Sequence, residues 1–252
     1  MPLELHGDDE EGRMAINSLK RFGVNTDYIR IDHQSTDIMN IIIPNSTLGD
    51  DTIIHSWYSP ITNTRTLEFR NNLPTTLPPE ILDKEIFVLL DKFETINLDF
   101  LTRIEHKKVC LDIGHYRFIE HFSKQYLTSF FKTANLIQLN AHVCDLLFER
   151  LQIQNEFEFF DLLCLDLLVI TKGKKGATFI FKENGSFKSI DQSPEMIAKV
   201  RDSSGAGDAF FATVIREYAY CPKIDMDFVN HTFKIANKAS RDVISTVGSR
   251  RI

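Results

Sequence analysis

The chain of 252 residues carries a formal net charge of −6, and 43% of its residues are hydrophobic. This size can bury a substantial core and suits one domain, or one domain with a small appendage. The acidic balance argues against a nucleic-acid-binding protein, and no apolar run approaches the length needed to cross a membrane.

The first residues and the cysteines indicate a cytoplasmic protein. Residues 1–7 contain neither a basic region nor an apolar stretch, so they do not look like a signal peptide. The 4 cysteines are scattered without metal-ligand spacing and are expected to be reduced thiols.

The N-terminal part is predicted to contain one helix followed by short strands. Residues 10–23 have apolar side chains at helical spacing, and Gly23 is a suitable stop. From residue 27 the character changes, because short β-branched or aromatic runs are separated by Pro, Gly and Asn, which predicts a meander of strands. These runs are 38–43, 52–57 and 66–69.

From residue 80 onward, predicted strands and helices alternate. Buried strands are predicted at 86–90, 108–113, 135–139 and 165–170, helices near 97–105, 118–131 and 141–151, a hairpin at 178–181 and 187–190, and two final helices near 207–219 and 225–243. Continuous apolar strands alternating with helices imply a mostly parallel, Rossmann-like sheet covered on both faces. We therefore expect a three-layer α/β/α fold.

The most informative segment is Asp202-Ser203-Ser204-Gly205-Ala206-Gly207-Asp208, which leads into an apolar run that suits a buried helix. Its glycines permit a tight turn and a close approach to a ligand. A helix that begins there directs its N–H groups and the positive end of its dipole toward an anion, for which phosphate is the best candidate. Asp208 would lie in the first turn, where a carboxylate suits a general base. The alternative is a common structural pattern, a Gly-rich turn before a helix with an N-terminal Asp.

Polar residues at the ends of three predicted strands indicate a ligand site in the same region as the 202–208 segment. Asp112, Asn140 and Thr171 each lie at or just past a strand end. Ligands of such sheets bind beyond the carboxyl ends of the strands. These residues and the 202–208 segment are therefore expected at one rim of the sheet.

The 202–208 segment resembles the signature of the ribokinase-like (PfkB) carbohydrate kinase family, Asp-Thr-x-Gly-Ala-Gly-Asp, with Ser203 in place of the Thr. Three further segments look like family motifs in the same order: Gly7-Asp8-Asp9-Glu10-Glu11-Gly12, Leu19-Lys20-Arg21-Phe22-Gly23-Val24, and Thr171-Lys172-Gly173-Lys174-Lys175-Gly176. The resemblance covers nearly the whole chain. It implies a single ribokinase-like domain over residues 1–252, in which residues 36–70 or so form a partial β lid.

The resemblance implies ATP-dependent phosphoryl transfer to a hydroxyl of a sugar or sugar-like small molecule, with ATP and Mg²⁺ as cofactors. Asp208 would be the catalytic base and would contact the substrate. The backbone N–H groups of Gly205, Ala206 and Gly207 would stabilise the transferred phosphoryl oxygens. Asp202 would lie near a site for a monovalent cation such as K⁺; its other interpretation is an N-cap or turn residue.

The resemblance also implies a nucleotide site. Thr171, Gly173 and Gly176 would line it, since glycines permit close backbone approach and a Thr hydroxyl can bond a phosphate or ribose oxygen. Asn140 matches the Asn of the family's Asn-x-x-Glu, and Asn237 matches a position that touches the nucleotide. The alternatives are a plain loop between β-strands and an ordinary helix-face residue.

Two departures from the family pattern concern the metal and the acceptor. Val143 stands where the family has the Glu that helps to place Mg²⁺, and valine offers no oxygen ligand. The chain begins at the strand before Gly7, so we expect it to lack the N-terminal segment with the Gly-Gly-x-x-x-Asn sugar loop. Glu94 would match a carboxylate that contacts sugar hydroxyls, or is an exposed Glu after a strand. An incomplete lid favours a homodimer formed through the lid.

These departures leave a second hypothesis open. The protein would then be a non-catalytic or truncated relative that binds a nucleotide or metabolite, or assembles with a partner, without turnover. The related vitamin kinases commonly have Cys where Asp208 stands, and a dehydrogenase would need Gly-x-Gly-x-x-Gly after its first strand. Neither pattern is found in this chain.

Overall fold

The computed structural model describes residues 5–33, 39–43, 52–56, 79, 83–90, 107–114, 119–120, 122–194, 200–201 and 203–245. The chain divides into two compact units, Met1–Leu82 with Glu94–Ile96, and Asp83–Phe93 with Asn97–Ile252. The predicted strand 66–69 and the predicted helix 97–105 lie outside the described residues. The single domain over 1–252, the lid at 36–70 and a dimer formed through it stay predictions.

The second unit contains an open six-stranded sheet in the order β10-β9-β8-β7-β6-β5. Its strands are β5 (Ile86–Leu90), β6 (Lys108–Ile113), β7 (Leu136–Asn140), β8 (Leu167–Thr171), β9 (Ala177–Glu183) and β10 (Ser186–Gln192). Strands β5 to β8 pair in parallel, and β9 and β10 form an antiparallel hairpin at one edge. The mostly parallel sheet is therefore confirmed.

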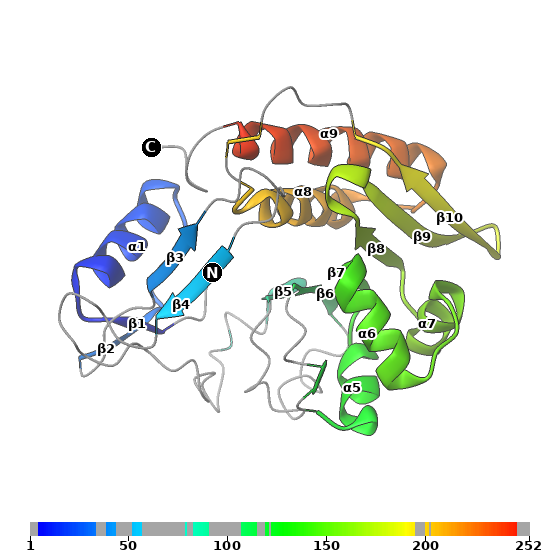
Figure 1. Cartoon of the computed structure of the whole chain (residues 1–252), viewed down its shortest axis with the longest axis horizontal. Coiled ribbons are helices and arrows are strands. Elements are labelled where there is room, and N and C mark those ends of the chain that lie inside the picture. Colours follow the sequence, from blue (N-terminus) through cyan, green and yellow to red (C-terminus); the bar gives the residue numbers. More distant parts are fainter. Residues whose placement is uncertain are drawn as a thin grey trace. The chain divides into compact units, whose positions relative to one another are not determined.

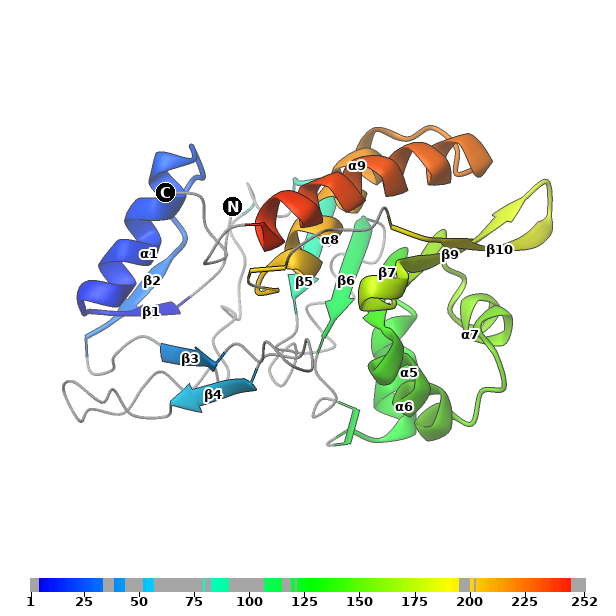
Figure 2. The same cartoon turned by 45° about the horizontal axis from the view of Figure 1, so that its top comes forward.

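Helices cover both faces of this sheet, as Figures 1 and 2 show. One face carries α5 (Lys124–Phe131), α6 (Ala141–Leu151) and α7 (Glu156–Leu163), and the other carries α8 (Ala206–Tyr220) and α9 (Met226–Ile244). The α8–α9 pair packs on the sheet through a buried cluster that includes Cys110, Leu136, Val169, Phe179, Phe211, Val214 and Val229. The three-layer α/β/α arrangement is thus confirmed, and it is held mainly by apolar burial.

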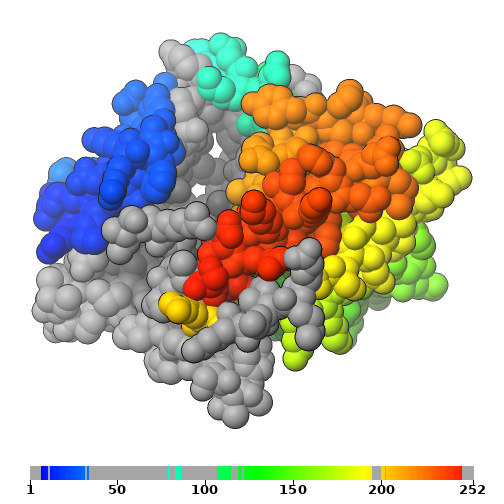
Figure 3. Space-filling model, turned by 90° about the horizontal axis from the view of Figure 1, so that it is seen from above, coloured from blue at the N-terminus to red at the C-terminus, as the bar shows by residue number. Residues whose placement is uncertain are grey.

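The outer face of α9 is part of the surface of this unit. Figure 3 shows α9, in red and orange, with the yellow residues of the β9–β10 hairpin beside it. The side-chain nitrogen Nε2 of Gln192, at the end of β10, donates to Oδ1 of Asn230 on α9 at 2.7 Å. The hairpin and the last helix are therefore joined by a polar contact as well as by the core.

Most helices of the second unit begin at a side chain that accepts hydrogen bonds from the first turn. The capping residues are Ser123 for α5, Asn140 for α6, Asn155 for α7 and Asp225 for α9. Helix α8 differs, because its N-cap is Gly205, with φ 78° and no side-chain cap. That left-handed backbone conformation favours glycine.

Helix α7 is absent from the sequence prediction. Its residues Glu156-Phe157-Glu158-Phe159-Phe160 alternate like a strand, yet they form a helix. Asn155 accepts from the N–H groups of Phe157 and Glu158, and the Glu158 carboxylate accepts from the N–H of Gln154 at 2.8 Å. This capping arrangement offsets the strand-like pattern, and Phe159 and Phe160 are buried.

The first unit contains two small sheets and one helix. Strands β1 (Leu5–Gly7) and β2 (Arg30–Asp32) pair in parallel, and α1 (Glu10–Arg21) lies between them along the chain. Strand β3 (Met39–Ile43) pairs antiparallel with β4 (Thr52–Ser56). The predicted helix at 10–23 and the predicted strands near 38–43 and 52–57 are therefore confirmed.

The Gly-Asp-Asp-x-x-Gly motif is the capped start of α1. Asp9 is the N-cap, and its Oδ1 accepts from the N–H of Gly12 at 2.8 Å. A Cβ atom on Gly12 would lie 2.2 Å from the carbonyl oxygen of Gly7. Glycine at this position therefore lets the helix start close against the end of the preceding strand.

Two features of the structure concern the predictions of reduced thiols and of no membrane-spanning segment: the state of the cysteines and the character of the helices. The four cysteines Cys110, Cys144, Cys164 and Cys221 are free thiols. Burial raises the pKa of the Cys110 and Cys144 thiols to about 12, so these two are protonated at neutral pH. Among the helices that the structure describes, none has the length and apolar character of a membrane span.

The close approach at Gly12 generates a stability prediction. A helical Gly→Ala change normally stabilises by roughly 0.5–1 kcal/mol. We expect Gly12→Ala to lower the free energy of unfolding instead, by about 1–2 kcal/mol, because the added Cβ overlaps a backbone oxygen. Urea unfolding followed by circular dichroism measures this.

The matched control is Gly207→Ala. Gly207 also lies in a first helical turn, but a Cβ there would meet no atom of the described ranges within 4 Å. This variant is expected to unfold at the same or a slightly higher urea concentration. Equal effects of the two substitutions would contradict the proposed contact at Gly12.

Candidate active site

The carboxyl ends of β6, β7 and β8 bring polar side chains to one edge of the sheet. Asp112 near the end of β6 is paired in register with Gln138 of β7, and Asn140 at the end of β7 is paired with Thr171 at the end of β8. The structure thus places Asp112, Asn140 and Thr171 at one rim, where parallel α/β sheets bind ligands.

The first turn of α8 presents open backbone donors. The N–H of Ala206 donates to the carbonyl oxygen of Ser203 at 3.2 Å, and the N–H of Ala209 to that of Gly205 at 2.9 Å. The N–H groups of Gly207 and Asp208 have no acceptor within the described residues, and both residues are exposed. Two adjacent open donors at the positive end of a helix dipole form a suitable site for an anion.

Two elements outside α8 hold this turn. The hydroxyl of Ser240, on α9, donates to the carbonyl oxygen of Ala206 at 2.8 Å. The side-chain nitrogen Nε2 of Gln138, on β7, lies 3.5 Å from the carbonyl oxygen of Gly207. Phe210 and Phe211, in the next turn, are buried against the sheet. The open donors are therefore fixed relative to the strand ends.

Asn140 connects the scaffold around this rim. Its Oδ1 accepts from the N–H of Val143 at 2.8 Å and caps α6, while its Nδ2 donates to the carbonyl oxygen of Gly114 at 2.9 Å. Both ends of the amide are thus used inside the protein. A contact between Asn140 and a nucleotide stays a prediction.

The residues around α6 do not fit a protein-held Mg²⁺ site. Val143 is 1% exposed and packs in the core, so its position supplies no oxygen ligand. Across the described ranges, no group of three or more His, Cys, Asp or Glu side chains could hold a metal ion. We therefore assign no step to a metal ion.

The loop after β8 is a tight turn braced by the hairpin. Its residues Gly173–Lys175 form the 3₁₀ turn η1, and Gly176 has φ 92°. A Cβ on Gly176 would lie 1.9 Å from the carbonyl oxygen of Gln192, so the backbone of β10 requires glycine here. The hydroxyl of Thr171 donates to the carbonyl oxygen of Leu139 at 3.3 Å.

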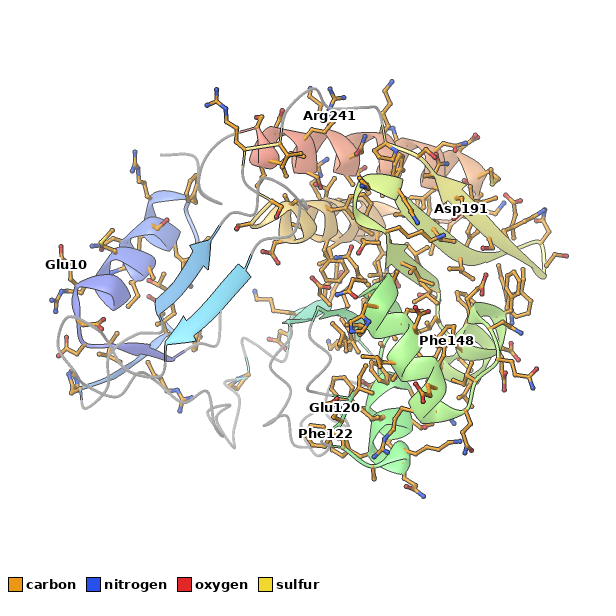
Figure 4. The ribbon with its side chains drawn as sticks, viewed as in Figure 1. Glu10, Glu120, Phe122, Phe148, Asp191 and Arg241 are labelled. Carbon is orange, nitrogen blue, oxygen red and sulfur yellow. The ribbon has the colours of Figure 1, made fainter. Side chains whose placement is uncertain are left out.

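The side chain of Lys172, which also belongs to this loop, is held by the hairpin. The Nζ of Lys172 lies 2.7 Å from Oδ1 of Asp191, which is labelled on β10 in Figure 4. Hydrogen bonds from Lys172 and Thr178 lower the pKa of Asp191. Lys172 is thus tied to the hairpin and steadies the turn at residues 173–176.

Of the remaining predicted site residues, one lies within the described part of the chain and two do not. Asn237 is half-buried on α9, one turn before Ser240 and on the same helix face. Since Ser240 contacts Ala206, Asn237 lies on the side of α9 that faces α8. Glu94 and Asp202 lie outside the described residues, so their substrate and cation roles stay predictions.

Gln138 and Ser240 are site-supporting residues that the sequence prediction missed. Gln138 could have been noticed, because it is the one polar side chain within the apolar run 136–139. Ser240 has no local signal, since a serine on a helix is unremarkable until the neighbour of that helix is known.

A model of the pfkB family carbohydrate kinases matches residues 5–251 of this chain. The chain belongs to this family. No curated protein sequence matches the chain.

The fold is shared with solved structures of low sequence identity. A nucleoside kinase from Burkholderia thailandensis in complex with inosine superimposes with a TM-score of 0.74 at 14% identity, covering 98% of this chain and 74% of that one. A fructokinase from Xylella fastidiosa with bound ATP gives 0.73 at 17% identity, covering 97% and 79%. A ribokinase from Giardia lamblia gives 0.72 at 14% identity, covering 98% and 78%. The ribokinase-like fold of the chain is thereby confirmed.

The two hydrogen bonds of Asn140 predict a stability effect that does not depend on any ligand. We expect Asn140→Ala to lower the free energy of unfolding by about 1–2 kcal/mol, because α6 loses its cap and Gly114 loses a donor. Asn140→Asp keeps the cap acceptor and loses only the donor, so its loss is expected to be smaller. Chemical denaturation without nucleotide checks the order of the two variants, and unchanged stability of Asn140→Ala would be inconsistent with these bonds.

Proposed function

We propose that this protein is an ATP-dependent kinase that transfers a phosphoryl group to a hydroxyl of a sugar or of a sugar-like molecule such as a nucleoside. The observation that carries the proposal is the start of α8, where two open N–H groups and the carboxylate of Asp208 lie in one exposed turn. Membership of the pfkB family, and fold relatives that are described with bound ATP or inosine, support it.

The backbone of α8 would stabilise the group in transfer. In phosphoryl transfer, charge is spread over the equatorial oxygens of the transferring group, and catalysis consists largely of positioning and electrostatic stabilisation. The N–H groups of Gly207 and Asp208, together with the helix dipole, would supply that stabilisation without reorganising during the reaction. Gly205 keeps the turn open, because as N-cap it has no side chain that could cover the donors.

Asp208 would act as the general base. Its carboxylate is exposed and has no ion-pair partner in the part of the chain that the structure describes, so it can accept a proton from an acceptor hydroxyl. It projects from the same turn that would hold the phosphoryl group. The attacking oxygen, the base and the transferring group would therefore be in reach of one another.

The turn at residues 171–176 would contact the nucleotide. It lies at the end of β8, which is directly beside β7 in the sheet, and the side chain of Gln138 on β7 reaches α8. The exposed Lys174 and Lys175 would add positive charge near the phosphates.

The proposal predicts that Asp208→Asn lowers turnover about 10³-fold, the size expected when a general base is removed. Its unfolding transition and its affinity for ATP are expected to stay close to wild type. A coupled ADP-release assay across sugars and nucleosides measures turnover. Asp227→Asn is the matched control, because Asp227 is an exposed Asp in the first turn of α9. Wild-type turnover by Asp208→Asn would contradict the assignment of the base.

Val143 favours a second candidate function, a non-catalytic relative that binds nucleotide without turnover. A buried valine stands where the family carries its metal-placing carboxylate. Calorimetric titration with ATP, combined with the turnover screen, separates the two candidates. Binding of ATP together with turnover of an acceptor supports the kinase, and binding without turnover of any acceptor supports the second candidate.

A further inference from the structure

Two side chains from outside α8 donate hydrogen bonds to consecutive carbonyl groups of its first turn. Ser240 Oγ lies 2.8 Å from the carbonyl oxygen of Ala206. Gln138 Nε2 lies 3.5 Å from the carbonyl oxygen of Gly207. The two donors come from two different elements, the last helix α9 and the strand β7 within the sheet.

Each of these carbonyl groups shares a peptide plane with an open donor. The carbonyl of Ala206 and the N–H of Gly207 belong to one planar peptide unit, and the carbonyl of Gly207 and the N–H of Asp208 belong to the next. A hydrogen bond to a carbonyl oxygen fixes the orientation of the plane. It also draws electron density from the amide nitrogen, so that the N–H at the other end becomes a stronger donor.

The surroundings of Gln138 indicate that its amide serves more than packing. The side chain is 3% exposed, and its Nε2 also donates to Oδ1 of Asp112 at 3.3 Å. A reversed amide would set its oxygen against two acceptors, so the orientation of the nitrogen is fixed. Its own oxygen Oε1 is buried and has no hydrogen-bond partner among the residues that the structure describes. Such an unsatisfied group is costly, and an apolar side chain would fill this strand position without that cost.

We propose that Gln138 and Ser240 are positioning residues of the phosphate site: they orient and polarise the peptides 206–207 and 207–208, whose N–H groups bind the transferring phosphoryl group. Neither side chain touches the substrate. The inference rests on the proposed function, since a phosphoryl group is the ligand that this pair of donors would hold.

The test uses the full chain with single substitutions that remove one donor at a time. Ser240→Ala removes the hydroxyl, Ser240→Thr retains it, and Gln138→Met replaces the amide by an apolar group of similar length. Thr213→Val is the matched control, because the Thr213 hydroxyl also donates to an α8 carbonyl, that of Ala209 at 2.9 Å. That carbonyl belongs to a peptide farther into the helix, away from the open donors.

The first measurement is made without ligand, by backbone amide and carbonyl chemical shifts. Ser240→Ala is expected to shift the Ala206 carbonyl and the Gly207 nitrogen, and Gln138→Met the Gly207 carbonyl and the Asp208 nitrogen. Ser240→Thr is expected to restore the wild-type values, and Thr213→Val to leave residues 206–208 unchanged. Unchanged shifts of residues 206–208 in Ser240→Ala and Gln138→Met would overturn the proposal.

The second measurement is steady-state kinetics. Ser240→Ala and Gln138→Met are each expected to lower kcat about tenfold, the change that loss of one hydrogen bond to the transition-state site would produce, with KM for the acceptor unchanged. Ser240→Thr restores kcat, and Thr213→Val leaves it unchanged. A lower unfolding temperature with wild-type kcat would assign both side chains a merely structural role and overturn the proposal.

The design separates this inference from the proposed function. If the wild-type chain binds ATP but turns over no acceptor, the kinase proposal fails, and the affinity for ATP replaces kcat as the readout. The positioning role then predicts affinity about tenfold weaker in Ser240→Ala and Gln138→Met than in Thr213→Val. Equal affinities of the three variants would overturn it.

Discussion

The site depends on a helix start that is left uncapped and is nevertheless held in place. Helices α1, α5, α6, α7 and α9 each begin at an Asp, Asn or Ser side chain that accepts a hydrogen bond from an N–H group of the first turn. Helix α8 begins at Gly205 instead, which costs only a few tenths of a kcal/mol relative to such a side-chain cap and leaves the first N–H groups uncovered. Its first turn is stabilised through its carbonyl oxygens by Ser240 and Gln138, so the N–H groups remain open toward a ligand.

Other residues of the rim have structural partners that explain their identity without any ligand. Asn140 caps α6, and the glycine at 176 accommodates the backbone of Gln192. Lys172 is tied to Asp191 on the hairpin. These contacts form a rigid edge at the ends of β7 and β8. The motif segments of this chain therefore contain two kinds of residue. Some build this edge, and others, such as Asp208, are exposed and have no ion-pair partner within the described residues.

Much of this architecture could be predicted from the sequence, because it follows from local patterns. The apolar runs gave β5 and β6 with the observed bounds, and the predicted helix at 141–151 is α6. Helix α7 was missed, since Phe and Glu alternate as in a strand and only the cap at Asn155 decides otherwise. The contacts of Gln138 and Ser240 join residues 69 and 34 positions apart along the chain, so no local pattern encodes them. Glu94 and Asp202 lie outside the described residues, so their substrate and cation roles stay predictions.

The central claim is that the open N–H groups of α8 bind phosphate. A crystal structure of the protein with a non-hydrolysable ATP analogue tests it most directly. The account predicts terminal phosphate oxygens within hydrogen-bonding distance of the backbone nitrogens of Gly207 and Asp208, with the Asp208 carboxylate facing the acceptor side. Terminal phosphates bound at another place, with the first turn of α8 making no contact to them, would contradict it.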